Sequence, residues 1–232
     1  HLDPDPNPIP PTSSPTAIFR TTIPNMMMAN KFTAQTPFPG AAADLALGFF
    51  RRATKWRPHP AKAATGGEDA FLATDYCIGV ADGVGYWDQT QGISAGAYSE
   101  GLMRSVYDFC EQEYGGQHCV PCMEALRYAY DDNKDITGTS TALLASLCGS
   151  NLEIASVGDC TVLVLRGGKV LYRNEEQYHS LNFPYQLGTG SKDLPNDCES
   201  ANIQVQPGDL VIMGSDGIFD NLYDRDVFSL ME

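Results

Sequence analysis

Short apolar runs and helical repeats define most of the elements expected in this chain. Two apolar runs, Ala70–Thr74 and Tyr76–Ala81, are bounded by turn residues and predict strands. Apolar residues then recur at spacings of three and four over Ile93–Glu113 and over Cys122–Lys134, which predicts two successive helices. Because such helices bury one apolar face each, we expect them to form a layer packed on a sheet.

The second half of the chain has the pattern of a strand-rich region. The expected strands, separated by Gly- and Asn-containing turns, are Ser140–Cys148, Leu152–Val157, Thr161–Leu165 and Val170–Tyr172. Residues 174–196 read as a surface loop, and Ile203–Val205 with Leu210–Met213 as a strand pair around a Pro-Gly-Asp turn. Asp224–Glu232 begins a further helix. The sum is an α+β layered domain.

The N-terminal region differs in composition from the rest of the chain. Residues 1–40 hold most of the 15 prolines and predict an extended tail outside the core, followed by a linker, 41–65, with a short helix over Ala41–Arg52. The globular domain is expected over 66–232. A proline-rich tail becomes ordered when it lies on a partner, so we expect a larger protein assembly around it. The chain begins at His1 rather than Met, which suggests a cleaved organellar presequence.

Composition excludes some functions. The chain of 232 residues has 15 basic and 29 acidic residues and a formal net charge of −14, which argues against nucleic acid and anionic membrane surfaces as partners. No apolar run approaches the length of a membrane span. Seven cysteines, several of them within apolar runs, predict reduced thiols. Cys119 and Cys122 form a lone C-x-x-C without a second ligand pair, which favours ordinary thiols over a zinc or redox site.

Two apolar strands end in Asp-Gly, at Asp82-Gly83 and at Asp216-Gly217. A single Asp-Gly after a strand is most often a turn. Two of them at the ends of neighbouring strands would bring carboxylates together, an arrangement that is unfavourable unless a cation lies between them. A third acidic pair, Glu68-Asp69, precedes another strand. The residues alone therefore leave a turn and a site for hard, oxygen-preferring cations as open alternatives.

Five ordered motifs decide between these alternatives. They are Gly67-Glu-Asp-Ala70, Val80-Ala-Asp-Gly-Val-Gly-Tyr-Trp87, Thr139-Ser-Thr-Ala142, Ala155-Ser-Val-Gly-Asp-Cys160 and Met213-Gly-Ser-Asp-Gly-Ile-Phe-Asp220. In order and spacing they resemble the type 2C (metal-dependent, PPM-type) protein serine/threonine phosphatases. The Asp-Gly-Val-Gly-x-Trp form is similar to the organelle-associated branch of that family. The resemblance spans about residues 66–232.

The resemblance implies a fold, cofactors and site residues. The fold would be two antiparallel β-sheets in a sandwich flanked by helices, with two Mg²⁺ or Mn²⁺ ions at one edge. By this resemblance Asp82 would bridge both ions, Glu68 and the Gly83 carbonyl would complete one, and Asp216 would bind the other. Asp135 matches a position that can help to hold a third ion. Asp159 is interpreted as structural.

The sequence departs from the family pattern at three places. Many members have His directly after the first Asp-Gly, where this chain has Val84. The phosphate-binding Arg falls on Ala64, for which Lys62 or Arg57 are the candidate replacements. The family's final metal-binding Asp lies several tens of residues after its Ser-Asp-Gly motif, so we expect a C-terminally incomplete domain that lacks its last strands.

The functional expectation is hydrolysis of phosphoserine and phosphothreonine in a phosphoprotein substrate by a metal-activated water. The alternative is a catalytically degenerate fold that serves as a structural subunit of a large organellar complex, and a plain metal-binding module is a third. The expected location is the mitochondrial matrix, with the chloroplast stroma as the alternative. Fold alone does not choose among these functions.

Overall fold

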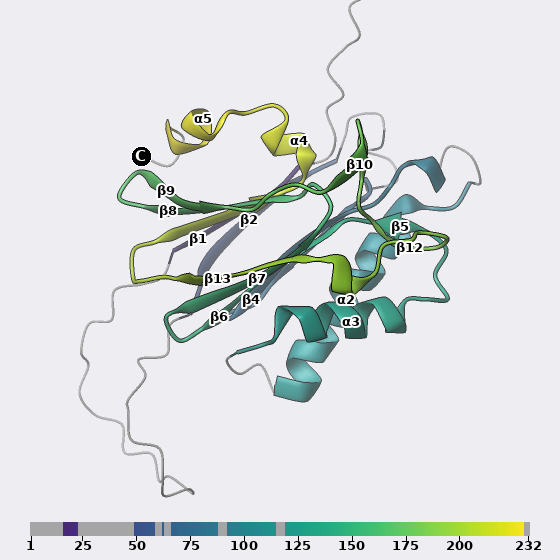
Figure 1. Cartoon of the computed structure of the whole chain (residues 1–232), viewed down its shortest axis with the longest axis horizontal. Coiled ribbons are helices and arrows are strands. Elements are labelled where there is room, and N and C mark those ends of the chain that lie inside the picture. The colour runs from purple at the N-terminus through teal and green to yellow at the C-terminus, as the bar shows by residue number, and fades with distance from the viewer. Residues whose placement is uncertain are drawn as a thin grey trace, which may run out of the picture.

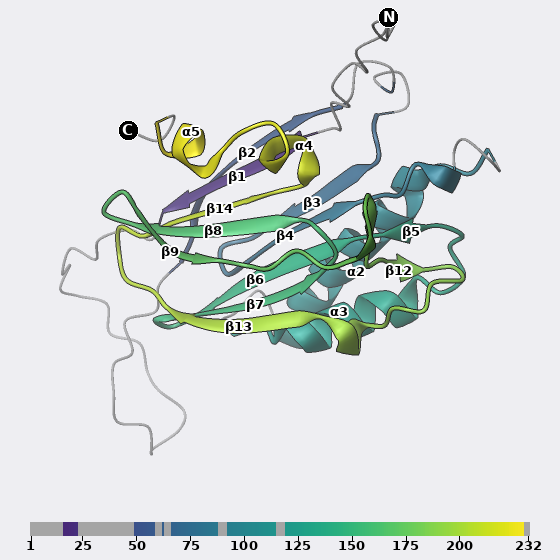
Figure 2. The same ribbon diagram turned by 45° about the horizontal axis from the view of Figure 1, so that its top comes forward.

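A computed structural model describes residues 16–22, 49–58, 62, 66–87, 92–114 and 119–229. Two five-stranded antiparallel sheets stack face to face, and helices cover both outer sides (Figures 1 and 2). The first sheet has the order β2-β1-β14-β8-β9 and the second the order β13-β7-β6-β4-β3. The predicted sandwich of two antiparallel sheets flanked by helices is therefore confirmed.

The first sheet joins strands from both ends of the chain. Its members are β1 (Thr16–Thr22), β2 (Arg51–Arg57), β8 (Thr161–Arg166), β9 (Lys169–Arg173) and β14 (Leu210–Gly214). Over this sheet lie the short helices α4 (Asp216–Phe219) and α5 (Asp224–Ser229), the latter confirming the helix expected there (Figure 2). Val227 of α5 packs on Leu163 and Ile212 beneath it.

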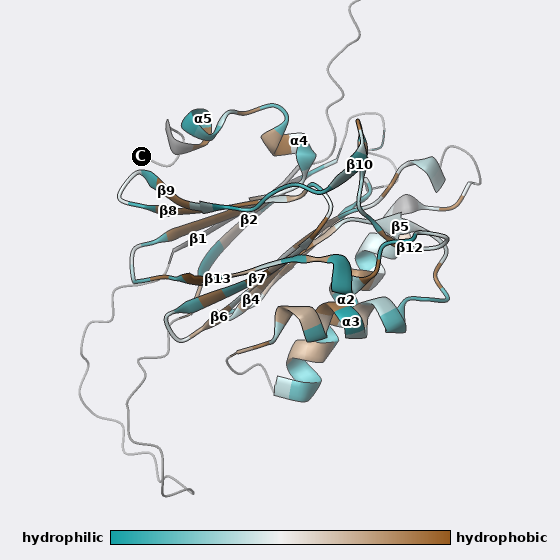
Figure 3. Cartoon of the chain, in the orientation of Figure 1, coloured by the Kyte–Doolittle hydropathy of each residue, from teal (hydrophilic) through white to brown (hydrophobic). Residues whose placement is uncertain are grey.

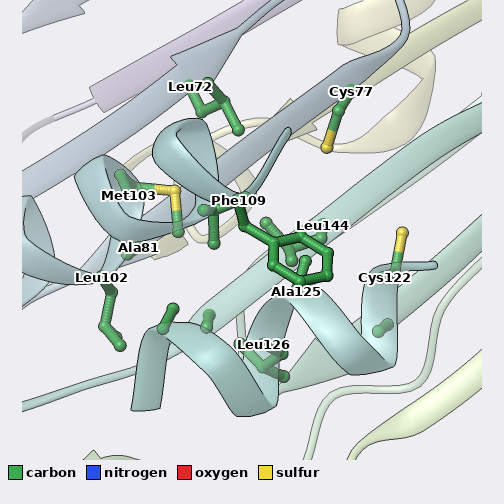
Figure 4. Packing of buried hydrophobic residues seen from close by; sticks show 14 of the residues in the cluster. Leu72, Cys77, Ala81, Leu102, Met103, Phe109, Cys122, Ala125, Leu126 and Leu144 are labelled. Carbon is green, nitrogen blue, oxygen red and sulfur yellow. The ribbon is translucent and has the colours of Figure 1, made fainter. Parts of the chain in front are cut away.

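The second sheet carries the helical layer. Its members are β3 (Asp69–Ala73), β4 (Cys77–Asp82), β6 (Ala142–Cys148), β7 (Asn151–Val157) and β13 (Glu199–Gln204). Helices α2 (Ala95–Tyr114) and α3 (Cys122–Asp132) pack on its outer face, as the periodicity predicted. Figure 4 shows Phe109 of α2 and Leu126 of α3 in the cluster that also contains Leu144 of β6. No helix in the described ranges has the length and apolar character needed to cross a bilayer.

Between the two sheets lies a second apolar layer. Val80, Leu143 and Ile154 from the second sheet meet Val162 and Met213 from the first, and all five side chains are buried. Hydrophobic stretches follow the strands of both sheets in Figure 3. Burial of this kind stabilises the fold by about 25 cal/mol per Å² of apolar surface. The ends of β4 and β14 are thus held by rigid, packed strands.

The prediction of an extended tail over residues 1–40 is wrong for one segment. Thr16–Thr22 forms β1, which pairs with β14 on one side and with β2 on the other. Its β-branched and aromatic residues suit a strand, although the surrounding prolines predict a tail. The rest of the tail, residues 1–15 and 23–40, lies outside the described residues.

The prediction of a helix over Ala41–Arg52 is also wrong for its described residues, 49–52. Arg51 and Arg52 belong to β2, while residues 41–48 lie outside the described part of the chain. β2 is an edge strand, and its exposed basic side chains suit that position because charged residues discourage edge-to-edge pairing. Pairing with β1 over seven residues overrides the local helical pattern.

The predicted pair of strands around Pro207-Gly208-Asp209 is a crossover instead. β13 pairs with β7 in the second sheet, whereas β14 pairs with β1 and β8 in the first. The turn is held by Asp209, whose carboxylate accepts from Gln206 N and forms an ion pair with Arg166 at 2.7 Å. A short loop of this kind reads as a hairpin because the sequence does not show which partner each strand takes.

The loop predicted over 174–196 contains short elements that form a flap at one end of the sandwich. They are β10 (Tyr178–Ser180), β11 (Phe183–Pro184), β12 (Leu187–Gly188) and the 3₁₀ helix η2 (Pro195–Asp197). β12 pairs with β5 (Thr139–Ser140), which ties this segment to the strand that leads into β6. The flap is therefore attached to the second sheet close to the end of β4.

Cys119 and Cys148 form a disulfide, so the prediction of reduced thiols is wrong for this pair. The bond joins the connection before α3 to the end of β6, two places that are 29 residues apart in the chain. Sequence spacing does not reveal this proximity. Cys122, the other member of the C-x-x-C, is a buried free thiol.

Candidate metal centre

The antiparallel pairing of β3 with β4 brings the first predicted ligands together. Asp69 is the register partner of Asp82, and Gly83 N donates to Glu68 O at 3.1 Å. Glu68 and Asp69 are buried, with 7 % and 6 % of their surfaces exposed. The predicted residues Glu68, Asp82 and Gly83 therefore converge at one end of the second sheet.

The Thr139-Ser-Thr motif fixes the backbone of Asp82. Asp82 N donates to Thr141 Oγ1 at 3.1 Å, and Ser140 Oγ donates to Asp82 O at 2.8 Å. Thr141 N donates to the same carbonyl at 3.0 Å. Because these bonds satisfy both backbone groups at the strand end, the Asp82 carboxylate is presented from a rigid position.

Asp216 reaches this cluster from the other sheet. It follows β14 as the first residue of α4, and the preceding Ser215 donates from its Oγ to Asp69 Oδ2 at 3.0 Å. Asp216 raises the pKa values of Asp69 and Asp82 through its charge. The ends of β4 and β14 thus meet, as the two Asp-Gly motifs predicted.

Burial and crowding raise the pKa values of Asp69 and Asp82. Burial raises the pKa of Asp69 to about 7, against hydrogen bonds from Asp82 and Ser215 that lower it. Burial and the charges of Asp69 and Asp216 raise the pKa of Asp82 well above its ordinary range. Carboxyl groups crowded in this way repel one another when both are ionised, so protonation or a bound cation relieves the repulsion.

Lys62 occupies the position next to Glu68. Its Nζ forms an ion pair with Glu68 Oε2, and a Cβ at Gly85 would lie 3.2 Å from this Nζ and 3.0 Å from Glu68 Oε1. Of the predicted replacements for the phosphate-binding Arg, Lys62 is therefore beside the cluster. Arg57 is exposed at the end of β2, and Ala64 lies outside the described residues.

Two acidic neighbours of Asp216 are Asp159, which the sequence interpretation treated as structural, and Asp220, which it did not single out. Burial, followed by the charge of Asp216, raises the pKa of Asp159 to about 7 and also raises the pKa of Asp220. Gly158 has φ +100°, and a Cβ there would lie 2.6 Å from Tyr185 O, so only glycine suits this turn. The Gly158-Asp159 turn places the Asp159 carboxyl group beside Asp216. The interpretation of Asp159 as structural did not anticipate this position.

Asp135 lies apart from these groups. It is exposed in the turn after α3, and no described contact joins it to the other carboxylates. The structure thus brings together Glu68, Asp82, Gly83 and Asp216 but does not bring Asp135 to them. Its assignment to a third ion stays a prediction.

The donor set suits hard divalent cations. Among the described residues, buried carboxylate oxygens without a hydrogen-bond partner are Glu68 Oε1, Asp69 Oδ1 and Asp216 Oδ1. Unpaired oxygens of this kind are costly unless a cation or water satisfies them, and Mg²⁺ and Mn²⁺ prefer such ligands. No three His, Cys, Asp or Glu side chains of the described ranges already surround one point as ligands. Because cations bind ionised carboxylates, we expect ion binding to compete with protons at Asp69 and Asp82, whose pKa values are raised.

Comparison with known proteins identifies relatives of most of this chain. The family model "Stage II sporulation protein E (SpoIIE)" matches residues 73–231. "Probable protein phosphatase 2C 55" of Arabidopsis thaliana is 39 % identical over 177 residues, covering 75 % of this chain and 37 % of the relative. "Protein phosphatase PTC7 homolog fig" of Drosophila virilis is 38 % identical over 176 residues, covering 67 % of this chain and 55 % of the relative. The chain thus spans well under two thirds of these relatives.

Solved structures agree with this result. The X-ray structure of the photosystem II phosphatase PBCP is 34 % identical, with a TM-score of 0.69, and the match covers 75 % of this chain and 69 % of that one. The catalytic domain of the serine/threonine phosphatase PstP, solved with two manganese ions, shares the fold at 13 % identity and a TM-score of 0.55, over 92 % of this chain and 84 % of that one. The fold, the converging carboxylates and these relatives agree: the chain belongs to the type 2C (PPM-type) family of protein phosphatases.

Proposed function

We propose that this chain forms the metal-binding part of a metal-dependent protein serine/threonine phosphatase. The observation that carries the proposal is the set of buried, unpaired carboxylate oxygens on Glu68, Asp69 and Asp216 at the meeting point of the two sheets. Membership in the type 2C family, with relatives named protein phosphatases, supports the same activity. The substrate is a phosphoserine or phosphothreonine side chain of a phosphoprotein.

Asp82, Glu68 and the Gly83 carbonyl are proposed to hold one ion, and Asp82 with Asp216 a second, with Asp135 contributing to a third. Bound divalent ions supply an activated water for direct attack and neutralise charge on the phosphate. The protein orients the ligands through the bonds of Thr141 and Ser140 to the Asp82 backbone. No imidazole follows the first Asp-Gly, because that position is Val84.

The proposal is tested by phosphate release from phosphoserine and phosphothreonine peptides with Mn²⁺ or Mg²⁺. We expect turnover that EDTA abolishes and that Asp82→Asn lowers by at least about 100-fold, as ligand loss removes metal chemistry. Asp131→Asn, an exposed carboxylate on α3, is the matched control and is expected to keep full turnover. Turnover that persists in EDTA, or that survives Asp82→Asn, would contradict a metal-dependent reaction.

A mitochondrial matrix location, with the chloroplast stroma as the alternative, is part of the proposal, as is an assembly that holds the N-terminal tail. A relative named for photosystem II supports an organellar setting. Fractionation of cells that express the tagged natural protein would test the location, and its native mass would test the assembly. No observation favours the alternative of a purely structural subunit.

A further inference from the structure

A cavity of about 710 Å³ lies beside the metal centre, between the flap and the segment that follows β4. Val84 and Trp87 line one side, and His179 and Phe183 line the other. Val84 comes two residues after Asp82, so the cavity begins next to the proposed ligands. Figures 1 and 2 both show β5, β10 and β12 gathered at this end of the sandwich.

The flap side of the cavity is held in one conformation. His179 Nε2 lies 2.9 Å from both carboxylate oxygens of Asp193, which is only 5 % exposed and also accepts from Gln186 N. The His179 ring stacks on Tyr185 at 4.2 Å between centroids and lies 5.4 Å from Phe183. A buried carboxylate and two rings therefore orient the wall that carries Phe183.

The opposite side is tied to the backbone around Asp82. Trp87 Nε1 donates to Thr139 Oγ1 at 2.8 Å, and Val84 N donates to Thr139 O at 2.9 Å. The next residue, Ser140, donates to the Asp82 carbonyl. One short strand thus connects the cavity wall with a proposed metal ligand. Because both walls are fixed, the cavity is preformed for a ligand.

The cavity presents apolar surface to solvent. Phe183 is 49 % exposed and the neighbouring Tyr86 is 58 % exposed. Burial of an aromatic ring against a partner is favourable, so these exposed rings can stabilise a bound group. Lys192 adds one positive charge to the lining, and Asp193 is already paired with His179. The remaining polar lining, which includes Asn182, Gln186 and Thr189, is uncharged. The walls therefore favour an apolar or aromatic guest over an acidic or basic one.

We infer that this cavity binds an apolar side chain next to the phosphorylated residue of the substrate, and so selects phosphoproteins by sequence. The inference rests on the proposed function, since a phosphate at the carboxylate cluster would place the adjoining residue at Val84. Burial of one such side chain in a preformed pocket accounts for a preference of about 10-fold or more.

The test compares phosphothreonine peptides that differ only in the flanking residue, with Gly, Phe, Glu or Lys on either side. Both the dissociation constant, from fluorescence anisotropy, and kcat/KM are measured with Mn²⁺. At one of the two flanking positions, we expect the peptide with Phe to bind and react at least about 10-fold better than the peptide with Gly. Phe183→Ala should reduce this ratio to below about 3.

Leu171→Ala is the matched control, because Leu171 is similarly exposed at 42 % but lies on β9 outside the cavity. It should keep the full Phe-to-Gly ratio. Equal binding of all peptides, a preference for Glu or Lys, or an unchanged ratio in Phe183→Ala would overturn the inference. Absence of turnover with a retained 10-fold binding preference would support the cavity and contradict only the proposed phosphatase activity.

Discussion

Replacement of Asp69 by Asn should stabilise the metal-free chain at alkaline pH. Asp69 is 6 % exposed, and its pKa is raised from 3.8 to about 7, chiefly by burial. The unfolded chain releases this proton near pH 4 while the folded chain keeps it to near pH 7. Stability without metal therefore falls as pH rises through this window.

The size of the effect follows from the same shift. Each pKa unit corresponds to about 1.4 kcal/mol, so the rise of the Asp69 pKa corresponds to at most roughly 4 kcal/mol. Because Asp69 and Asp82 interact and titrate as a pair, we expect Asp69→Asn to gain only part of this, about 1–3 kcal/mol at pH 8, and much less at pH 5. The amide oxygen can still accept from Ser215, and the amide has nearly the size of the carboxyl group, so the packing is kept.

The assay is urea unfolding in EDTA at pH 5 and pH 8, followed by circular dichroism. Asp131→Asn on the exposed side of α3 is the control, and its free energy of unfolding should follow that of the unmodified chain at both pH values. Equal pH dependence in Asp69→Asn and the unmodified chain, or a less stable variant at pH 8, would refute a raised Asp69 pKa.

Two further predictions concern the surroundings of the site and the disulfide. Gly85→Ala places a methyl group 3.0 Å from Glu68 Oε1, so we expect Mn²⁺ affinity to fall roughly 10-fold, as with other changes beside a ligand, in a calorimetric titration. An unchanged affinity would show that Glu68 moves freely. Cys119→Ser removes the bond to Cys148 and should lower the free energy of unfolding by about 2–4 kcal/mol. Reductant should lower the free energy of unfolding of the unmodified chain by the same amount. If neither the substitution nor the reductant lowers it, the disulfide does not stabilise the fold.

Local pattern was sufficient for most of the sandwich. The apolar runs that end at Asp82 and at Gly214 are buried strands of two packed sheets, and the periodic segments are the helices α2 and α3. Nonlocal pairing was not predictable in the same way. β1 was hidden among prolines, and the crossover after Gln204 looks like a hairpin because the chain does not reveal its strand partners.

The candidate site likewise has residues that local pattern predicts and residues whose role depends on nonlocal contacts. Asp82 and Asp216 were candidates because each carboxylate follows an apolar strand, and the resemblance to the type 2C phosphatases then assigned them to the ions. Asp159 was interpreted as part of a turn, because its closeness to Asp216 depends on the contact between two sheets. The ion pair between Lys62 and Glu68 likewise depends on how a loop folds back on β3.

The central claim is that the carboxylates at the ends of β4 and β14 form a divalent-cation centre. The most direct measurement is a calorimetric titration of Mn²⁺ into the unmodified chain, Asp82→Asn and Asp216→Asn, at pH 6 and pH 8. We predict binding that strengthens with pH, because the ion competes with protons for carboxylates whose pKa values are raised, and that weakens at least about 10-fold in each variant. No Mn²⁺ binding by the unmodified chain, or equal binding by the variants, would contradict the account.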